Sequence, residues 1–250
     1  MSGRPALLVT GGSRGIGAAV CLLAAERGWR VAVNYAANAG AAEGVVRRIE
    51  ASGGEAFAVQ GDVGVEADIL AMFEAADSRF GRLDGLVNNA GVIDVSTRVD
   101  AMSAARLERM MRINIIGSML CAREAVRRMS TRHGGQGGAI VNISSMAAII
   151  GAPAQYVDYA ASKAAIDAFT LGLAREVAAE GVRVNGVRPG IIDTEIHASG
   201  GDADRAARLA SAIPMQRPGS AREVADGILY LLSPSSSYTT GAILNVSGGR

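Results

Sequence analysis

The chain has 250 residues, enough for one sizeable α/β domain, and no linker-like stretch divides it. Its 25 basic and 24 acidic residues leave a formal charge of +1, which excludes the strongly basic surface that nucleic acid or an anionic membrane would require. No apolar stretch approaches the ~20 residues of a membrane span, and no signal-peptide pattern is present. We therefore expect a single cytoplasmic domain over residues 1–250 that acts on a small molecule.

Short apolar or β-branched runs recur along the chain, with helical segments between them. They cover residues 6–10, 30–34, 55–60, 85–88, 139–143, 183–187 and 242–246. Strands that alternate with helices predict right-handed crossovers and a mostly parallel sheet. Because runs such as residues 140–143 are too apolar for a sheet with one wet face, helices should cover both faces. The prediction is an α/β fold with a doubly wound, mostly parallel seven-stranded sheet.

A glycine-rich turn follows the first predicted strand. Its sequence, Gly11-Gly12-Ser13-Arg14-Gly15-Ile16-Gly17, leads into a segment of helical composition. Such a turn lets the backbone approach a pyrophosphate closely and directs the amide groups of a helix N-terminus toward it. Glycine clusters alone are common in loops. The position directly after a buried type of strand predicts dinucleotide binding.

Turn and polar residues follow four further strands. They are Asp62 and Val63, the segment 88–91, Ser144 and Ser145, and the segment 188–190. In an open parallel sheet, ligands bind beyond the carboxyl ends of the strands. Each of these residues alone is ordinary at a strand end. Together they predict one ligand site at this edge of the sheet.

Tyr159 and Lys163 stand four residues apart in a segment with helical composition. Residues at this spacing share a helix face. A neighbouring cation favours the phenolate, so we expect the pKa of Tyr159 to fall below its usual value of roughly 10. A chance pair on a helix would have the same spacing. The hypothesis is a tyrosine that exchanges protons nearer neutral pH.

The two cysteines and two histidines give no sign of a disulfide or a metal site. Cys21 and Cys121 fall inside apolar helical patterns, where a small buried thiol is the usual explanation. His133 and His197 lie in no cluster with the ligand spacing that zinc needs. We expect no bound metal.

With these motifs together, the sequence resembles the short-chain dehydrogenase/reductase family, in its single-domain branch with a Tyr-x-x-x-Lys active site, over nearly the whole chain. Segment 10–17 is similar to the family's cofactor turn, Asp62 to its adenine contact, segment 88–91 to its Asn-Asn-Ala-Gly element and segment 189–190 to its turn near the nicotinamide. The resemblance implies a Rossmann-type domain. It also implies a homotetramer built from long helices and the C-terminal segment.

The expected interface helices are segments 118–132 and 160–180. Both carry apolar residues on more than one face, which is consistent with burial against another subunit. The same faces can equally be covered within one chain.

By the resemblance, the catalytic residues are Asn114, Ser145, Tyr159 and Lys163. Tyr159 would donate a proton to a carbonyl as hydride arrives, or accept one from an alcohol in reverse, while Ser145 would bind the same oxygen. Lys163 would lower the pKa of Tyr159 and hold the nicotinamide ribose. Asn114 would distort its helix and hold a water that links Lys163 to solvent.

The spacing between Ser145 and Tyr159 departs from the family's pattern. It is fourteen positions, one more than in most members, which implies an extra residue within segment 151–158. Ser144 lies farther away and is the weaker candidate. Tyr156 is a second phenol, but Ala160 and not a lysine follows it by four residues, so we expect Tyr156 to line the mouth of the pocket.

NADP is the expected cofactor, with NAD as the alternative. The second strand ends without the acidic residue that usually binds the ribose of NAD, and Arg14 is suited to a 2′-phosphate. Ala36 stands near where NADP-specific members often have another basic residue. Because this chain lacks that residue, NAD stays the alternative cofactor. The resemblance implies cofactor contacts by Gly11, Ser13, Arg14, Gly15, Ile16, Gly17, Asn34, Tyr35, Asp62, Val63, Asn89, Ala90, Gly91, Tyr159, Lys163, Pro189, Gly190, Ile192 and Thr194.

The expected activity is hydride transfer between NADP(H) and a small carbonyl or secondary alcohol, with a mobile lid over segment 194–213. His197, within that lid, is either a substrate contact or a solvated loop residue. Two other functions stay open. One is a non-catalytic dinucleotide-binding redox sensor, and the other is an epimerase or dehydratase on the same fold.

Overall fold

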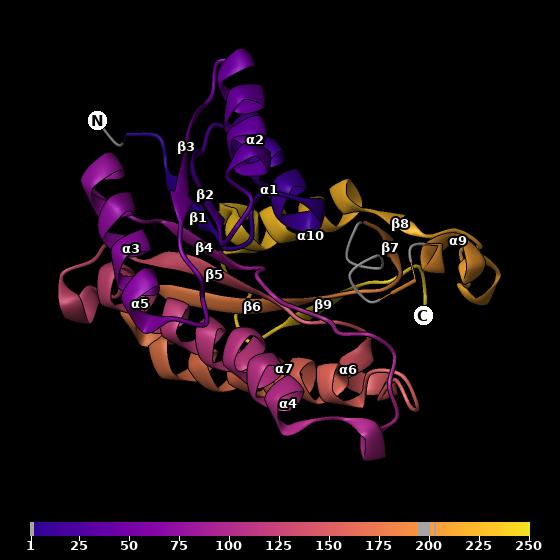
Figure 1. The fold of residues 1–250 in the computed structure, drawn as a ribbon. Helices are drawn as coiled ribbons and strands as arrows, with labels where there is room; N and C mark the ends of the chain where they lie inside the picture. The colour runs from indigo at the N-terminus through magenta and orange to yellow at the C-terminus, as the bar shows by residue number, and fades with distance from the viewer. Residues whose placement is uncertain (1–2, 195–200, 203) are drawn as a thin grey trace.

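A single seven-stranded parallel sheet runs through the molecule (Figure 1). The computed structural model describes residues 3–194, 201–202 and 204–250. The strand order is β3-β2-β1-β4-β5-β6-β9. The strands are β1 (Ala6–Val9), β2 (Arg30–Tyr35), β3 (Glu55–Gln60), β4 (Gly85–Asn88), β5 (Gly138–Ile143), β6 (Val182–Pro189) and β9 (Ile243–Val246). The predicted doubly wound, seven-stranded α/β fold is confirmed.

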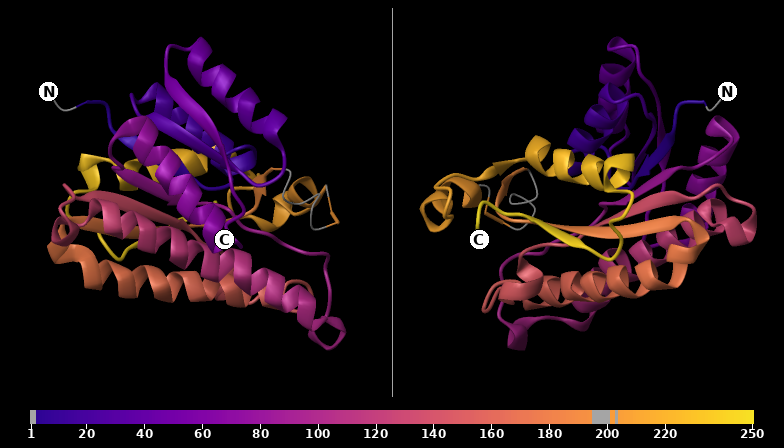
Figure 2. Two further views of the ribbon diagram at one scale, coloured as in Figure 1. Left: turned by 60° about the vertical axis from the view of Figure 1, so that its left-hand side comes forward. Right: turned by 180° about the vertical axis from the view of Figure 1, so that it is seen from behind.

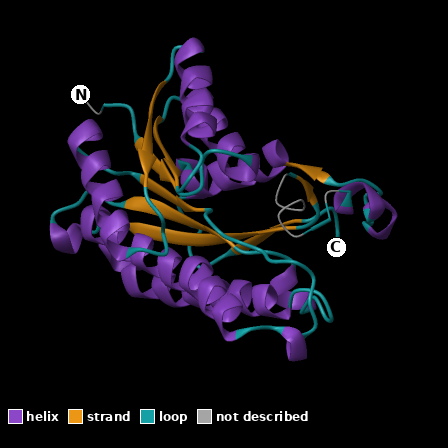
Figure 3. Cartoon of the chain, in the orientation of Figure 1, coloured by secondary structure: helices purple, strands orange, loops and turns teal. Residues whose placement is uncertain are grey.

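Helices cover both faces of the sheet (Figures 2 and 3). One face carries α1 (Gly15–Glu26), α2 (Ala39–Ala51) and α10 (Ala221–Leu232). The other carries α3 (Glu66–Phe80), α5 (Ser118–Met129) and α7 (Val157–Val177), with α4 (Ala104–Met111) against α7. Short elements complete the chain: α6 (Ala147–Ile150), α9 (Arg205–Arg208), the π-helix η2 (Arg112–Gly117), and the 3₁₀ turns η1 (Val99–Ala101), η3 (Thr131–His133), η4 (Ala178–Glu180), η5 (Ala210–Ala212) and η6 (Pro234–Ser236).

The core consists of two apolar layers separated by the sheet. Along β1, Leu7 and Val9 pack toward α1, α2 and α10, whereas Ala6 and Leu8 pack toward α3, α5 and α7. Successive side chains of a strand point to opposite faces, so a strand buried on both faces is apolar at every position. This explains why the strands appear in the sequence as continuous apolar runs. Within the described residues, no helix has the length and apolar character to cross a membrane.

The structure adds elements that the sequence pattern did not reveal. A small second sheet pairs β7 (Ile192–Asp193) with β8 (Gly219–Ser220). Strands of two residues have no periodicity, so the pattern could not predict them. Strand β6 also continues two residues beyond the predicted end, to Pro189, because β9 pairs with it there.

The position of β1 creates a crevice at the carboxyl edge of the sheet. From β1 the sheet extends through β2 and β3 on one side and through β4, β5, β6 and β9 on the other. The chain therefore leaves the ends of β1 and β4 in opposite directions. In doubly wound folds, this is where ligands bind.

Candidate active site

The glycine turn after β1 is held by side chains from two other strands. The Gly11 amide donates to Asn34 Oδ1 at 3.0 Å, and the Gly12 amide donates to the Asn34 oxygen at 2.8 Å. From the end of β4, Asn89 Nδ2 donates to the oxygens of Thr10 and Gly11 at 2.9 and 3.0 Å. The ends of three strands, β1, β2 and β4, thus fix the turn that leads into α1.

Gly17 supports this turn from beneath. A Cβ at Gly17 would overlap the Gly11 oxygen and lie 2.6 Å from Asn89 Nδ2. Gly17 is buried and lines neither of the cavities described below. The structure therefore gives Gly17 a packing role, in which α1 approaches the turn more closely than any side chain allows, and its direct cofactor contact stays a prediction.

Two cavities meet at the crevice. One, of about 420 Å³, lies over the glycine turn and the ends of β2, β3 and β4. The other, of about 170 Å³, lies between the end of β5, the start of α7 and the segment after β6. Ile16, Asn89, Gly91 and Thr194 line both cavities, so the two form one continuous site.

Most of the predicted site residues line this continuous site. The larger cavity takes Gly11, Ser13, Arg14, Gly15, Ile16, Asn34, Tyr35, Asp62, Val63, Asn89, Ala90, Gly91 and Thr194. The smaller takes Ile16, Asn89, Gly91, Ser145, Tyr159, Lys163, Pro189, Gly190, Ile192 and Thr194. Gly17 and Asn114 line neither cavity.

The larger cavity has a basic residue at the end of the site that is farther from Tyr159. Arg14 is exposed and precedes α1, across from the end of β2. Among the described residues, Asp62 is the one acidic side chain that lines this cavity, and its Oδ1 accepts a hydrogen bond from the Gly64 amide at 2.8 Å. The charge beside the end of β2 is therefore positive.

Asn34 also lines the larger cavity, but most of its side chain's hydrogen-bonding capacity is used within the protein. Its side chain is buried and donates to the oxygens of Val59 and Gly61 at 3.3 and 2.9 Å, while its Oδ1 accepts from Gly11. The side chain is therefore turned inward and braces the glycine turn. Tyr35, the next residue, lines the cavity as predicted.

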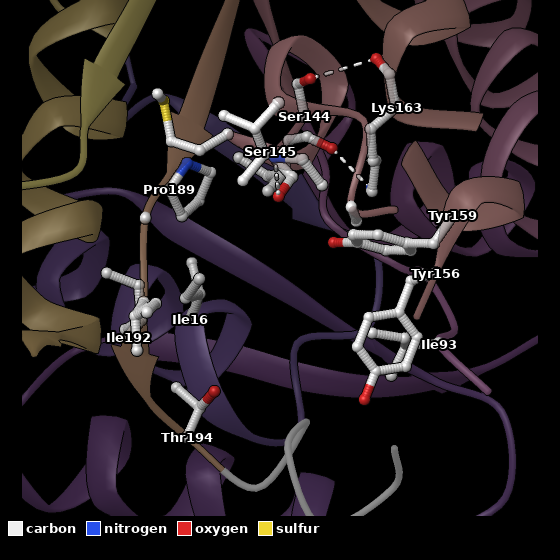
Figure 4. A pocket seen from close by; sticks show the side chains of 18 of the residues that line it. Ile16, Ile93, Ser144, Ser145, Tyr156, Tyr159, Lys163, Pro189, Ile192 and Thr194 are labelled. Carbon is white, nitrogen blue, oxygen red and sulfur yellow. Dashed lines mark hydrogen bonds between the residues drawn. The ribbon is translucent and has the colours of Figure 1, made fainter. Parts of the chain in front are cut away.

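Ser145, Tyr159 and Lys163 converge in the smaller cavity (Figure 4). The Tyr159 hydroxyl points toward Ser145, and Lys163 Nζ lies 5.6 Å from the centroid of the Tyr159 ring. Lys163 Nζ donates to the Ile143 oxygen at 2.8 Å. A hydroxyl pair and an ammonium thus meet at the wall of one cavity.

The pKa of Tyr159 does not follow the sequence prediction. Burial raises this pKa, and the hydrogen bond with Ser145 opposes the shift without reversing it. The predicted lowering of this pKa is wrong for this structure, because burial outweighs the opposing hydrogen bond with Ser145. The phenol therefore keeps its proton at neutral pH.

Burial also acts on Lys163, in the opposite direction. It lowers the pKa of Lys163 to about 8, and the carboxylate of Asp167, one helical turn later, partly restores it. Asp167 is itself held by Arg188, whose Nη2 lies 2.8 Å from Asp167 Oδ2. Since a pKa of about 8 lies above neutral pH, the ammonium form predominates there.

The two serines after β5 have different surroundings. The Ser144 hydroxyl is buried and donates to the Lys163 backbone oxygen at 3.1 Å. Ser145 instead faces Tyr159, and its Oγ accepts from the Ala147 amide at 3.1 Å. The geometry thus favours Ser145 over Ser144 as the serine that meets a bound substrate.

Asn114 lies in a helix distortion, as predicted. Residues Arg112–Gly117 form a π-helix, a rare local widening that often occurs at functional sites. The buried Asn114 side chain exchanges two hydrogen bonds with the Val92 backbone, at 2.8 and 3.0 Å, and donates to Ser162 Oγ at 3.1 Å. Asn114 therefore fixes the loop after β4 against α7.

The loop before α7 takes an unusual backbone path. Ala152 and Ala154 have φ values of 43° and 56°, in the left-handed region that non-glycine residues rarely adopt. Both lie in segment 151–158, where the sequence implies an extra residue. Tyr156, at the end of the loop, is buried and lines the smaller cavity near Ile93 (Figure 4).

The predicted lid falls partly outside the described residues. Residues 195–200, which include His197, and residue 203 lie outside them. The described part of the lid contains α9 and η5, where Ala206 and Ile213 pack against Ile191. Thr194, at its start, lines both cavities.

The sequence prediction missed most of the apolar wall of the smaller cavity. This wall includes Ile93, Met146, Ile150 and Ile191. These residues stand in loops or in a single helical turn, where the spacing of apolar residues has no fixed period. The available signal was that Ile93, Met146 and Ile191 lie within two positions after the Asn-Asn-Ala-Gly, Ser-Ser and Pro-Gly segments.

Comparison with known proteins agrees with this geometry. A family model described as enoyl-(acyl carrier protein) reductase matches residues 11–250. The chain belongs to the short-chain dehydrogenase/reductase family. Among its relatives, the uncharacterized oxidoreductase YgfF of Escherichia coli is 53% identical over 97% of this chain and 98% of its own.

Other members of the short-chain dehydrogenase/reductase family match nearly as much of the chain. The 3-oxoacyl-[acyl-carrier-protein] reductase FabG of Staphylococcus aureus is 36% identical over 97% of this chain and 96% of its own. A short-chain dehydrogenase from Burkholderia cenocepacia, solved in complex with NADP, superposes with a TM-score of 0.89 at 34% identity, over 99% of this chain and 97% of its own. The family resemblance stated from the sequence is confirmed.

Proposed function

We propose that the protein transfers a hydride between NADP(H) and a small carbonyl or secondary alcohol, with Tyr159 as general acid and base. One observation carries the proposal: the hydroxyls of Tyr159 and Ser145 meet beside Lys163, in a cavity that continues into the one over the glycine turn. A dinucleotide and a second small molecule fit such a pair of joined cavities. The NADP complex of the Burkholderia cenocepacia relative supports this choice of cofactor.

The residues of the larger cavity suit a dinucleotide. The turn presents the backbone of Gly11 and Gly15 to the cavity, the first turn of α1 carries no acidic residue, and Arg14 supplies positive charge. When bound, the cofactor supplies or accepts the hydride. Gly91 leaves room beside Lys163, since a Cβ at Gly91 would lie 3.4 Å from Lys163 Nζ.

Each residue of the smaller cavity then has a defined task. In the reductive direction Tyr159, whose raised pKa keeps the phenol protonated, donates its proton to the substrate oxygen. Ser145 donates a hydrogen bond to the same oxygen and stabilises the charge that develops there. Lys163, mostly an ammonium below pH 8, offsets negative charge on Tyr159 after the proton has left.

The cavity walls favour a carbonyl with apolar substituents. Around the two hydroxyls lie Ile93, Met146, Ile150, Ile191 and Ile192. Such walls bind the hydrocarbon groups of a substrate. A 3-oxoacyl compound, the substrate type in the name of the Staphylococcus aureus relative, is one candidate substrate. We also propose that segment 194–213 is a lid over this cavity.

The decisive experiment titrates the purified protein with NADPH and NADH in parallel, following nicotinamide fluorescence. A panel of ketones and aldehydes is then added, and NADPH oxidation is followed. Tight NADPH binding with oxidation by at least one carbonyl supports the proposal. Binding of NADPH without turnover on any compound would favour the redox-sensor alternative, and binding of neither cofactor would overturn the dinucleotide site.

Replacing Arg14 with glutamine is expected to weaken NADPH binding by about 10- to 100-fold, because a charge-assisted phosphate contact is lost. NADH lacks the 2′-phosphate, so its Kd should change less than threefold. The control is Arg47→Gln, which removes a cation from an exposed ion pair on α2 outside both cavities. Equal losses for both cofactors in Arg14→Gln would contradict a 2′-phosphate contact.

We also propose that the protein is a homotetramer. Ile116, Met119 and Leu171, from η2, α5 and α7, are exposed although each is a large apolar residue. The inner faces of α5 and α7 are already covered by the sheet, so these outer residues are the ones left for a second subunit. Sedimentation equilibrium at micromolar concentration should give the mass of four chains, and the mass of one chain would contradict the assembly.

A further inference from the structure

We infer that Arg106 is a positioning residue that fixes where Tyr159 and Ile93 lie on the substrate side of the active site. It ties the first turn of α7, which carries Tyr159, to the loop after β4, which carries Ile93. This inference rests on the proposed function. It concerns a residue that lines neither cavity and was not among the predicted site residues.

The Arg106 guanidinium contacts two separate segments at once. Its Nε and Nη2 donate to Asp158 Oδ2 and Oδ1 at 2.7 and 3.2 Å, which is a two-point ion pair. Its Nη1 donates to the Val95 oxygen at 2.7 Å and to Thr97 Oγ1 at 3.0 Å. Arginine has a planar fork of donors, and this geometry uses three of its nitrogens.

The ion pair is almost fully buried. The side chain of Arg106 is 9% exposed, and that of Asp158 is 0% exposed. A buried carboxylate without a partner is strongly unfavourable, so Asp158 holds Arg106 in one geometry. Exposed ion pairs elsewhere on the surface have no such constraint. The pair is therefore a fixed point of the structure.

The Arg106–Asp158 ion pair lies next to the two segments that carry Tyr159 and Ile93, which line the smaller cavity. Asp158 directly precedes Tyr159 in the first turn of α7, so its position also sets that of the phenol. The loop after β4 is held at Val92 by Asn114 and at Val95 and Thr97 by Arg106, with Ile93 between these anchors. The Thr97 amide also donates to the Gln155 oxygen at 2.9 Å, which joins the loop before α7 to the same assembly.

The cofactor side is built without Arg106. The glycine turn is braced by Asn34 and Asn89, whose side-chain hydrogen bonds run to Gly11, Val59 and Gly61 and to Thr10 and Gly11, respectively. Loosening the Arg106 anchor should therefore shift Tyr159 and Ile93 relative to a bound substrate and leave the dinucleotide site in place. A misplacement of about 1 Å at the reacting groups is enough to lower the rate on the order of 10²-fold.

The test compares Arg106→Lys with Arg109→Lys. A lysine at position 106 still supplies a cation for Asp158, but one ammonium cannot also reproduce the donors to Val95 and Thr97. Arg109 is the matched control, because it lies on the same helix, three residues later, and pairs with Asp94 of the same loop at 3.0 Å. In that pair Arg109 is exposed and Asp94 is half-buried, and the ion pair joins α4 to the loop without including α7.

For Arg106→Lys we expect kcat/KM for the carbonyl to fall at least tenfold, with a higher KM and a lower kcat, while the Kd for NADPH stays within about twofold. Arg109→Lys should keep all three constants within about twofold. A merely structural weakening would lower NADPH affinity together with turnover, so that result, or equal constants in the two variants, would overturn the inference.

Amide hydrogen exchange tests the anchor independently of catalysis. In Arg106→Lys, peptides that cover segments 92–98 and 157–160 should exchange faster than in the unmodified protein, whereas those that cover segment 11–20 should not. In Arg109→Lys the segment 157–160 should stay protected. If the unmodified protein turns over no carbonyl, the proposed function fails, and unchanged exchange in Arg106→Lys would overturn the anchor itself.

Discussion

Replacing Tyr159 with phenylalanine is expected to lower kcat by about 10²- to 10⁴-fold, the usual contribution of a positioned general acid. The variant keeps the ring that packs beside Lys163 and removes the oxygen that points toward Ser145. Because the larger cavity does not include Tyr159, the Kd for NADPH should stay within about threefold. Steady-state kinetics with the best carbonyl and a fluorescence titration with NADPH measure both effects.

Tyr156→Phe is the matched control for this substitution. Tyr156 is also a buried phenol at the wall of the smaller cavity, but it lies outside the Tyr159 and Lys163 pair. Its loss should change kcat less than tenfold. If Tyr159→Phe retained activity within tenfold of the unmodified enzyme, or if the two variants lost similar activity, Tyr159 would not be the proton donor.

The sequence predicted the parts of the site that depend on neighbours along the chain. Tyr159 and Lys163 lie within one helix, and segment 11–17 forms one turn and the start of the helix after it. The spacing of these residues in the sequence therefore determines how they lie relative to one another. The seven strands were predictable for a similar reason, since burial on both faces leaves continuous apolar runs.

The missed features depend on contacts between distant segments. The direction of the Tyr159 pKa shift follows from burial by several loops, and no local spacing reveals that burial. Arg106 and Asp158 are 52 positions apart in sequence and meet only because α4 packs against α7. Asn34 is a polar residue at the end of a strand, where cofactor contacts are expected, yet its side chain hydrogen-bonds to the backbone of Gly11 and Gly61. Short-range patterns thus predicted the residues that we propose as reacting groups, whereas tertiary packing determined their pKa shifts and the contacts that hold them in place.

Replacing Gly17 with alanine is expected to weaken NADPH binding at least tenfold and to destabilise the fold by about 1–3 kcal/mol, as overpacking does. The new methyl group would meet the Gly11 oxygen and Asn89 Nδ2, so relief requires the glycine turn to move. For a domain of this size, such a loss lowers Tm by roughly 2–12 °C. Thermal unfolding and NADPH titration check the two effects together.

Gly44→Ala separates the loss of space at Gly17 from the general effect of a methyl group in a helix. Gly44 lies inside α2, and the nearest atom to a Cβ there is Arg47 Nη2 at 3.9 Å, the mobile end of a side chain. Because alanine is a better helix former than glycine by about 0.5–1 kcal/mol, Gly44→Ala should raise Tm slightly and leave the Kd for NADPH unchanged. If Gly17→Ala behaved in the same way, the close approach of α1 to the turn would not be what shapes the dinucleotide site. If Gly17→Ala lowers Tm and weakens NADPH binding while Gly44→Ala does neither, the loss of binding follows from displacement of the glycine turn.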